Sequence, residues 1–437
     1  PKDASQNPFR REVAKSSAFF DVKIPANAKL TEPYFLENER NGYLYDLENT
    51  ANPNPPFQSE IIRAGITIEV DGKEIRFGQP LEYRFADDIR GEIRRELNIV
   101  PALSVSLDQK LLIVPQSEKA QVKRVVMSLT NNSSKQIRGN VGLNIVGAKE
   151  IDWRYTASSA TFDLKNKGEK TAVSFDVTIP PKTKAGEYHI YAQAMVGEAL
   201  ATQEMNVIAY PHIQTHRFYT RAETKVVVTD LKTAPVKIGY IAGSGDRVFE
   251  AIRQMNFDVQ MLGENDLTNG DLSKFDTIVV GIRASQVRAD FVANHQRLLE
   301  YVKNGGNLLV QYQLPVYQSL LPFPAKMDAR VVDENAKVTI LEPTNPIFNF
   351  PNKITDKDFE NWVQERNLYA FSTFDANYKP LLESHDANEP ENKGGLMVAN
   401  IGKGKYIYCS YAFFRQLPAG NAGAYRLFAN LLSQPKG

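Results

Sequence analysis

The sequence has a single cysteine, Cys409, among 437 residues. One cysteine excludes an internal disulfide and a zinc site built from cysteines. An excess of one charge is also missing, because 52 Lys and Arg residues balance 51 Asp and Glu residues. This balance gives no electrostatic reason to expect a nucleic acid or an anionic membrane as a partner. No apolar run approaches the roughly 20 residues of a membrane helix, so we predict no membrane span.

Start signals are missing as well. The first residue, Pro1, is not an initiator Met, and no apolar core of a signal peptide follows it. We therefore interpret the sequence as a piece of a longer polypeptide. At roughly 100 to 200 residues per domain, its length allows about two to four domains. Hydrophobic residues make up 42% and charged residues 24% of the sequence, which is ordinary for folded globular domains.

Short strand patterns dominate the first half of the sequence. The segment Ile66–Phe77 holds two alternating runs on either side of Asp71-Gly72, which is the strongest short signal for a β-hairpin. Apolar residues also alternate in Val173–Ile179, and turn signals separate such runs. This spacing is typical of immunoglobulin-type sandwiches. We predict two all-β, Ig-like sandwiches, 1–102 and 103–222.

The pattern changes in the second half. Continuous apolar runs at Val236–Ile241, Thr277–Gly281 and Asn307–Val310 predict buried strands, and Phe291–Lys303 predicts a helix. Such strands alternate with helices in parallel sheets that are covered on both faces. We therefore predict an α/β domain over 223–437.

One glycine-rich loop follows the first of these strands. Gly243-Ser244-Gly245-Asp246 lies where open α/β sheets bind ligands, at a strand's carboxyl end and a helix's start. The third glycine of the dinucleotide pattern is replaced by Val248, and no P-loop lysine follows. Ser244 or Asp246 can instead cap the next helix. Both alternatives, a capped turn and a ligand loop, stay open.

Further candidate residues follow from the expected topology. If the first and third strands flank the switch point of the sheet, Ser244 and Asp246 lie near Arg283, with Gln313 from the next strand close by. Arg283 can offer a forked donor to a carboxylate ligand, or it can pair with Asp246. The ligand-binding candidates are Ser244, Asp246, Arg283, Gln313 and Arg415. A cleft filled by Phe414 and Arg415 would argue against the site, and we assign no catalytic residue and no metal ligand.

Three other features have simpler explanations. His212 and His216 are about 13 Å apart if they lie on a strand, too far for one metal ion. Cys409 lies in an alternating strand without the sharp turn of a nucleophile elbow, which indicates a buried structural thiol. The segment Asp356–Tyr378 mixes carboxylates with aromatic rings. It fits sugar binding or, as we prefer, rings packed in a core.

Several runs of the sequence are long and fairly specific: Ala234–Tyr240, Ile278–Ala284, Tyr301–Gly306, Trp362–Arg366 and Phe413–Gly420. On these runs the chain resembles the region downstream of the catalytic domain in large PIG-L/LmbE-type deacetylases, which are sugar N-deacetylases common in Bacteroidetes-like bacteria. The resemblance begins near Phe20 and is strongest over 233–433. In that family an upstream domain with an H-P-D-D-type zinc motif performs the chemistry, and no such motif occurs in these 437 residues.

The resemblance carries several expectations. It implies that the chain's partner is its own upstream catalytic domain, with a glycan as a further candidate partner. It implies that zinc belongs to that upstream domain and that this chain holds no cofactor. It also implies a periplasmic or extracellular location, including the cell surface.

The last domain also resembles the class I glutamine amidotransferase fold, a flavodoxin-like α/β architecture. In that family a catalytic Cys ends one strand, whereas the run Asn307–Gln313 has Tyr or Gln at that position. The resemblance therefore implies the fold without the amidotransferase chemistry.

Three functions remain open at this point. The first is a non-catalytic accessory region that acts as a scaffold or binds a glycan. The second is a hydrolase or other enzyme of an unrecognised type, with its site at the carboxyl edge of the α/β sheet. The third is a stand-alone carbohydrate-binding protein. Fold analogy cannot choose among them.

Overall fold

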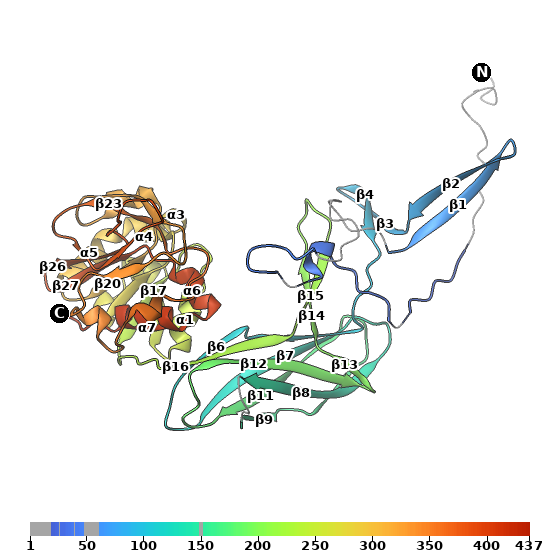
Figure 1. Ribbon diagram of the computed structural model, residues 1–437, viewed down its shortest axis with the longest axis horizontal. Coiled ribbons are helices and arrows are strands. Elements are labelled where there is room, and N and C mark those ends of the chain that lie inside the picture. The colour runs from blue at the N-terminus through green and yellow to red at the C-terminus, as the bar shows by residue number, and fades with distance from the viewer. Residues whose placement is uncertain (1–18, 26, 39, 48–60, 148–151) are drawn as a thin grey trace, which may run out of the picture. The chain divides into compact units, whose positions relative to one another are not determined.

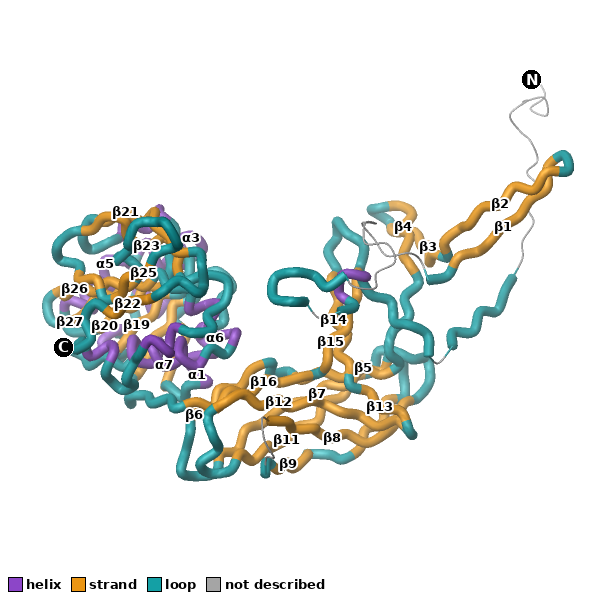
Figure 2. The backbone as a smooth tube through the Cα atoms, viewed as in Figure 1, coloured by secondary structure: helices purple, strands orange, loops and turns teal. Residues whose placement is uncertain are grey.

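The computed structural model describes residues 19–25, 27–38, 40–47, 61–147 and 152–437. Pro1 lies outside these residues. Strands make up most of the regular structure (Figures 1 and 2). Among the described residues, no helix is long and apolar enough to cross a membrane. The chain forms two compact units, Pro1–Ala102 with Met205–Thr220 and Leu103–Glu204 with Arg221–Gly437.

The first unit is built from hairpins. Its described elements are one short 3-10 helix and strands that pair two by two: η2 (Tyr34–Leu36), β1 (Arg63–Val70) with β2 (Lys73–Pro80), β3 (Glu82–Asp87) with β4 (Gly91–Glu96), and β14 (Gln203–Ile208) with β15 (His216–Arg221). Strands β14 and β15 fall inside the predicted second sandwich, yet in the structure they pair only with each other.

The hairpin β1–β2 has the turn that the sequence predicts. Asp71 and Gly72 have φ angles of 49° and 73°, the left-handed pair that a type I′ turn requires. Ile68 pairs with Ile75 across the strands, and these side chains are 43% and 49% exposed. No second sheet covers this apolar face within the described residues. The described part of 1–102 therefore forms separate hairpins in place of the predicted sandwich.

The second unit begins with a β-sandwich. One sheet contains β5 (Leu103–Leu107), β7 (Gln121–Asn131), β11 (Lys170–Ile179) and β9 (Arg154–Ala157), in that order. The other contains β10 (Thr161–Leu164), β8 (Ile137–Gly147), β12 (Gly186–Val196), β16 (Glu223–Thr229) and β6 (Leu111–Pro115), with β13 (Ala199–Ala201) beside β12.

One hydrophobic core lies between these two sheets. Val125 and Phe175 from the first sheet and Ile190 and Val226 from the second are at most 1% exposed within it. The coarse prediction of a sandwich in this region is therefore confirmed. Strand β16 pairs with both β12 and β6, so the sandwich extends past the expected boundary at residue 222.

The rest of the second unit is organised around a seven-stranded sheet. Its order is β18 (Asp258–Met261), β17 (Lys237–Ile241), β19 (Thr277–Val280), β20 (Asn307–Gln311), β27 (Gly404–Cys409), β26 (Leu396–Ile401) and β24 (Lys379–Pro380). The first five strands are parallel, and β26 and β24 join in antiparallel fashion. Two small antiparallel sheets pair β21 (Ala325–Val331) with β23 (Asn367–Phe374) and β22 (Val338–Ile340) with β25 (Leu382–Ser384).

Helices cover both faces of this sheet. Tyr240 and Val279 share one core with α1 (Val248–Gln254), α6 (Phe413–Ala419) and α7 (Ala422–Leu432), which lie together in Figure 1. Ile241 and Val280 point into the other core, with α2 (Glu264–Thr268), α4 (Ala289–Ala293) and α5 (His295–Lys303). Shorter elements complete the domain: α3 (Ala284–Val287), η3 (Leu272–Lys274), η4 (Pro315–Leu320), η5 (Pro346–Phe348) and η6 (Asp356–Phe359).

The predicted helix Phe291–Lys303 is interrupted. Asn294 separates α4 from α5, and its side-chain amide donates to the backbone oxygen of Asp290 at 2.9 Å. The Asn294 backbone N–H donates to the same carbonyl at 3.0 Å, and an Asn that bonds back to the preceding turn in this way weakens and bends a helix.

Candidate functional site

The carboxyl edge of the parallel sheet is the region where the candidate residues meet. The loop after β17 lies directly against the loop after β19, because the Ser244 N–H donates to the Ile282 carbonyl at 2.8 Å. A Cβ atom built on Gly243 would lie 2.0 Å from that carbonyl oxygen. Backbone therefore closes the space between these two strand ends, and Ser244 is exposed to solvent outside it.

Asp246 holds the start of helix α1. Its Oδ1 accepts hydrogen bonds from the Tyr240 hydroxyl and, at 3.1 Å, from the Val248 N–H. Its Oδ2 is buried without a hydrogen bond, beside Gly281. Burial, and then the Asp246 charge, raises the pKa of Tyr240 well above its ordinary value, so the phenol stays a donor. Asp246 is thus bonded to Tyr240 and not to Arg283.

Gln313 braces the turn that follows β19. Its amide nitrogen donates to the carbonyls of Gly281 and Gln311, both at 2.8 Å. Its amide oxygen accepts from the N–H and the hydroxyl of Ser285, both at 3.1 Å. The side chain is fully buried. Both ends of Gln313 are therefore engaged inside the protein and are not directed at a ligand.

Arg283 is directed at the next strand end. Its Nη2 donates to the Tyr312 hydroxyl at 3.1 Å, and the guanidinium carbon lies 5.5 Å from the centre of the Tyr312 ring. The Nε is buried without a hydrogen bond. The hydrogen bond to Tyr312 raises the pKa of Arg283, and burial raises the pKa of Tyr312. The pair therefore stays a charged donor and a neutral phenol at physiological pH.

Phe414 and Arg415 complete this group on the far side of Tyr312. The rings of Tyr312 and Phe414 have centres 5.2 Å apart, and the Arg415 guanidinium lies 4.9 Å from the Phe414 ring centre. The Nε of Arg415 donates to Oε1 of the buried Glu365 at 2.9 Å, and its Nη1 donates to Gln364. Phe414 and Arg415 thus occupy the space beside Tyr312, which is the arrangement that argues against the predicted cleft.

The Tyr369 ring also packs against Tyr312, with ring centres 5.2 Å apart. We name this group the Tyr312 cluster: Arg283, Tyr312, Tyr369, Phe414 and Arg415. Its backbone is unusual, because Arg283 and Tyr369 have φ angles of 52° and 59°, and Gln364, which contacts Arg415, has 68°. A left-handed residue other than glycine costs roughly 1 to 2 kcal/mol. Such residues persist only where the surroundings fix them, so this edge of the domain is held rigidly.

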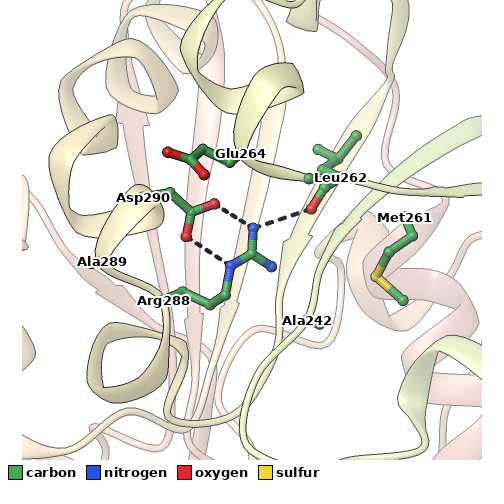
Figure 3. A pocket seen from close by; sticks show the side chains of 8 residues that line it. Ala242, Met261, Leu262, Glu264, Arg288, Ala289 and Asp290 are labelled. Carbon is green, nitrogen blue, oxygen red and sulfur yellow. Dashed lines mark hydrogen bonds and ion pairs between the residues drawn. The ribbon is translucent and has the colours of Figure 1, made fainter.

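An open pocket of about 480 Å³ lies one strand away, at the ends of β17 and β18 (Figure 3). Its charged residues are Glu264, Arg288 and Asp290, and Met261 and Ala242 supply apolar surface. Nε and Nη2 of Arg288 donate to the two Asp290 oxygens at 2.8 and 2.5 Å, and Nη2 also donates to a backbone carbonyl. None of these residues is among the ligand-binding candidates predicted from the sequence. The one available signal is an Arg-x-Asp pair just before a predicted helix.

The remaining motifs are structural or lie elsewhere. Burial raises the pKa of the Cys409 thiol to about 12, which leaves it protonated and unreactive. His216 begins strand β15, and His212 lies in the turn before it. In the described parts of the chain, no three His, Cys, Asp or Glu side chains gather closely enough to hold a metal ion. Trp362 and Phe371 from the aromatic segment are buried in the two cores.

No protein-family model matches the chain, and no curated protein matches it. Similar solved structures include a β-galactosidase from Rahnella sp. R3, with 12% identity and a TM-score of 0.30 over 44% of this chain and 30% of that one. A protein described as a GMP synthase component from Thermoplasma acidophilum has 10% identity and a TM-score of 0.31, over 46% and 96% of the two chains.

A PapD-like domain of human CEP192 is similar to 31% of this chain over 92% of its own length, with 14% identity and a TM-score of 0.19. The matched part of this chain spans less than a third of the β-galactosidase. At these identities and TM-scores the similarities carry no argument about function.

Proposed function

We propose that this chain is a non-catalytic accessory region of a larger PIG-L-type sugar N-deacetylase, in which the α/β domain is a rigid scaffold. The observation that carries the proposal is Gln313. It lies just past the end of β20, where related α/β folds place reactive groups, and all of its hydrogen-bonding capacity is used inside the protein. Three of its bonds go to the turn after β19 and one goes to the Gln311 carbonyl of β20. Tyr312 before it is likewise bonded within the Tyr312 cluster.

The topology supports the flavodoxin-like, amidotransferase-like part of the proposal. Counted in chain order, the parallel strands β18-β17-β19-β20-β27 run 2-1-3-4-5, the order of doubly wound flavodoxin-like sheets. In such sheets the ligand crevice lies between strands 1 and 3. Here the contact of the Ser244 N–H with the Ile282 carbonyl fills that place. An inherited scaffold whose original crevice has closed accounts for both observations.

The sandwich supports the remainder of the proposal. Its two sheets around one core are of the kind expected for an Ig-like spacer module. We propose that it holds the α/β domain beside an upstream catalytic domain that carries the zinc, and that the whole protein acts on glycans in the periplasm or outside the cell.

The test compares this chain with the same chain extended by the sequence that precedes Pro1. Both are assayed for metal content and for hydrolysis of N-acetyl sugars. We expect one zinc and deacetylase activity only in the extended protein. In the extended protein, Gln313→Glu should lower the thermal stability and leave the turnover of each folded molecule unchanged. One tightly bound zinc in this chain, together with turnover, would overturn the proposal.

A further inference from the structure

The pocket at the ends of β17 and β18 presents hydrogen-bond donors that the protein does not use. Arg288 donates through Nε and Nη2 to Asp290 and to the Leu262 carbonyl. Within the described residues its Nη1 makes no hydrogen bond, and Figure 3 shows this third nitrogen directed toward the side of the pocket where Met261 lies. Side chains of Arg288 and Asp290 are only 21% and 13% exposed, so the guanidinium is held in one orientation.

The pocket also presents an acceptor that the protein does not use. The Glu264 carboxylate makes no ion pair or hydrogen bond with the described residues, and Figure 3 shows it beside Asp290. Glu264 is exposed to solvent. Its charge contributes to the raised pKa of Arg288, while Arg288 lowers the pKa of Asp290. Two carboxylates and one guanidinium leave one negative charge in excess in the pocket.

Apolar surface faces these charges. Met261 and Ala242 line the pocket, and the apolar residue Met261 is 42% exposed to solvent. The pocket is open to solvent, and its volume of about 480 Å³ leaves room for one sugar ring against its wall. A ligand that fits must therefore be small, carry a C–H face, accept hydrogen bonds from Arg288, and bring a positive charge to Glu264.

We propose that this pocket binds an amino sugar through its free ammonium group. The ammonium pairs with Glu264, ring hydroxyls accept from Nη1 of Arg288, and the C–H face of the ring lies on Met261. An N-acetylated sugar lacks this charge and leaves Glu264 without an ion-pair partner, and an acidic sugar is repelled by the excess carboxylate. The inference goes beyond the proposed scaffold role and does not rest on it, because it uses only the residues of the pocket.

The test titrates the whole chain with glucosamine, N-acetylglucosamine, glucose and ethanolamine at pH 7. The readouts are calorimetry and the NMR signal of the Met261 methyl group, which is assigned with Met261→Leu. We expect glucosamine to bind at least tenfold more tightly than each of the other three compounds and to shift the Met261 signal. Glu264→Gln should weaken glucosamine binding about tenfold, because it removes the charge that pairs with the ammonium group. The variant should fold normally, because the Glu264 carboxylate makes no hydrogen bond or ion pair with the described residues.

Glu300→Gln is the matched control, because Glu300 is an exposed glutamate on α5 of the same domain. It should leave the affinity for glucosamine unchanged. Equal binding of ethanolamine would show that the ring and its hydroxyls contribute nothing, and it would overturn the proposal. So would equal binding of N-acetylglucosamine, a Glu264→Gln variant with unchanged affinity, or no glucosamine binding at all. These results leave the zinc and turnover test of the scaffold role unaffected.

Discussion

Replacing Gly243 by alanine tests whether the space between the first and third parallel strands is closed. The added Cβ would lie 2.0 Å from the Ile282 carbonyl oxygen and 2.7 Å from the Gly281 carbonyl carbon. Both are backbone atoms, so no side-chain rotation relieves the contact. The two loops must separate, and the hydrogen bond from the Ser244 N–H, now 2.8 Å long, must break.

The expected loss follows from these two effects. A broken backbone hydrogen bond costs about 1 kcal/mol, and overpacking that displaces backbone costs about 1 to 3 kcal/mol. The sum, roughly 2 to 4 kcal/mol, lowers the Tm by roughly 5 to 15 °C for a domain of this size. The measurement is differential scanning calorimetry of the whole chain, following the transition of the second unit.

Gly245→Ala supplies the control for this experiment. Gly245 has a φ of +69°, but a Cβ there meets no atom within 4 Å. Only the left-handed strain remains, about 1 kcal/mol, so the Tm should fall by only about 2 to 4 °C. If Gly243→Ala loses no more stability than Gly245→Ala, the loops are not pressed together and an open cleft between them becomes tenable again.

Three further predictions concern single side chains of the same domain. Burial lowers the pKa of His295 in the folded protein, whereas the unfolded residue titrates near 6.5. As the pH falls from about 7 to 5, the unfolded chain therefore binds more protons than the folded chain, and the free energy of unfolding decreases. His295→Leu should flatten this slope in urea midpoints at the two pH values, and an unchanged slope would exclude His295 as its cause. Tyr240→Phe should cost about 1.5 to 3 kcal/mol in urea unfolding, because it removes the donor to the Asp246 carboxylate; a loss under about 0.5 kcal/mol would contradict that bond. Arg283→Gly should be more stable than Arg283→Ala by about 1 kcal/mol, because the backbone is left-handed there; the reverse order in thermal melts would contradict the φ angle.

Local chemistry explains which parts of the fold the sequence predicts. Asp71-Gly72 determines its turn through backbone sterics alone, so the hairpin can be predicted without any knowledge of its surroundings. The apolar runs at β17, β19 and β20 are buried on both faces, and their composition indicates this directly. By contrast, alternation in β1 shows that a face is apolar but not whether another sheet covers it, and the sandwich predicted over 1–102 depended on that missing information.

Strand partners at long range are the second limit. The Val-rich strand β16 could have opened the α/β domain as well as closed the sandwich, since both settings favour β-branched residues. Its pairing with β6, more than a hundred residues earlier in the chain, decides the matter. Sequence spacing contains no record of that pairing, which is why the boundary was expected at 222.

The candidate site shows the third limit, which concerns how polar side chains are satisfied. The topology predicted from the sequence correctly brings Gly243 beside Gly281. It cannot show that the Gln313 amide forms hydrogen bonds with the turn that follows β19. A buried polar group must find partners, and the nearest backbone is usually the partner it finds. Glu264 and Arg288 differ in this respect, because each keeps hydrogen-bonding capacity unused at the wall of a pocket. Unused capacity facing solvent, rather than position at a strand end, is therefore the property that separates a binding residue from a brace in this domain, and it can be recognised only once the partners of every neighbouring group are known.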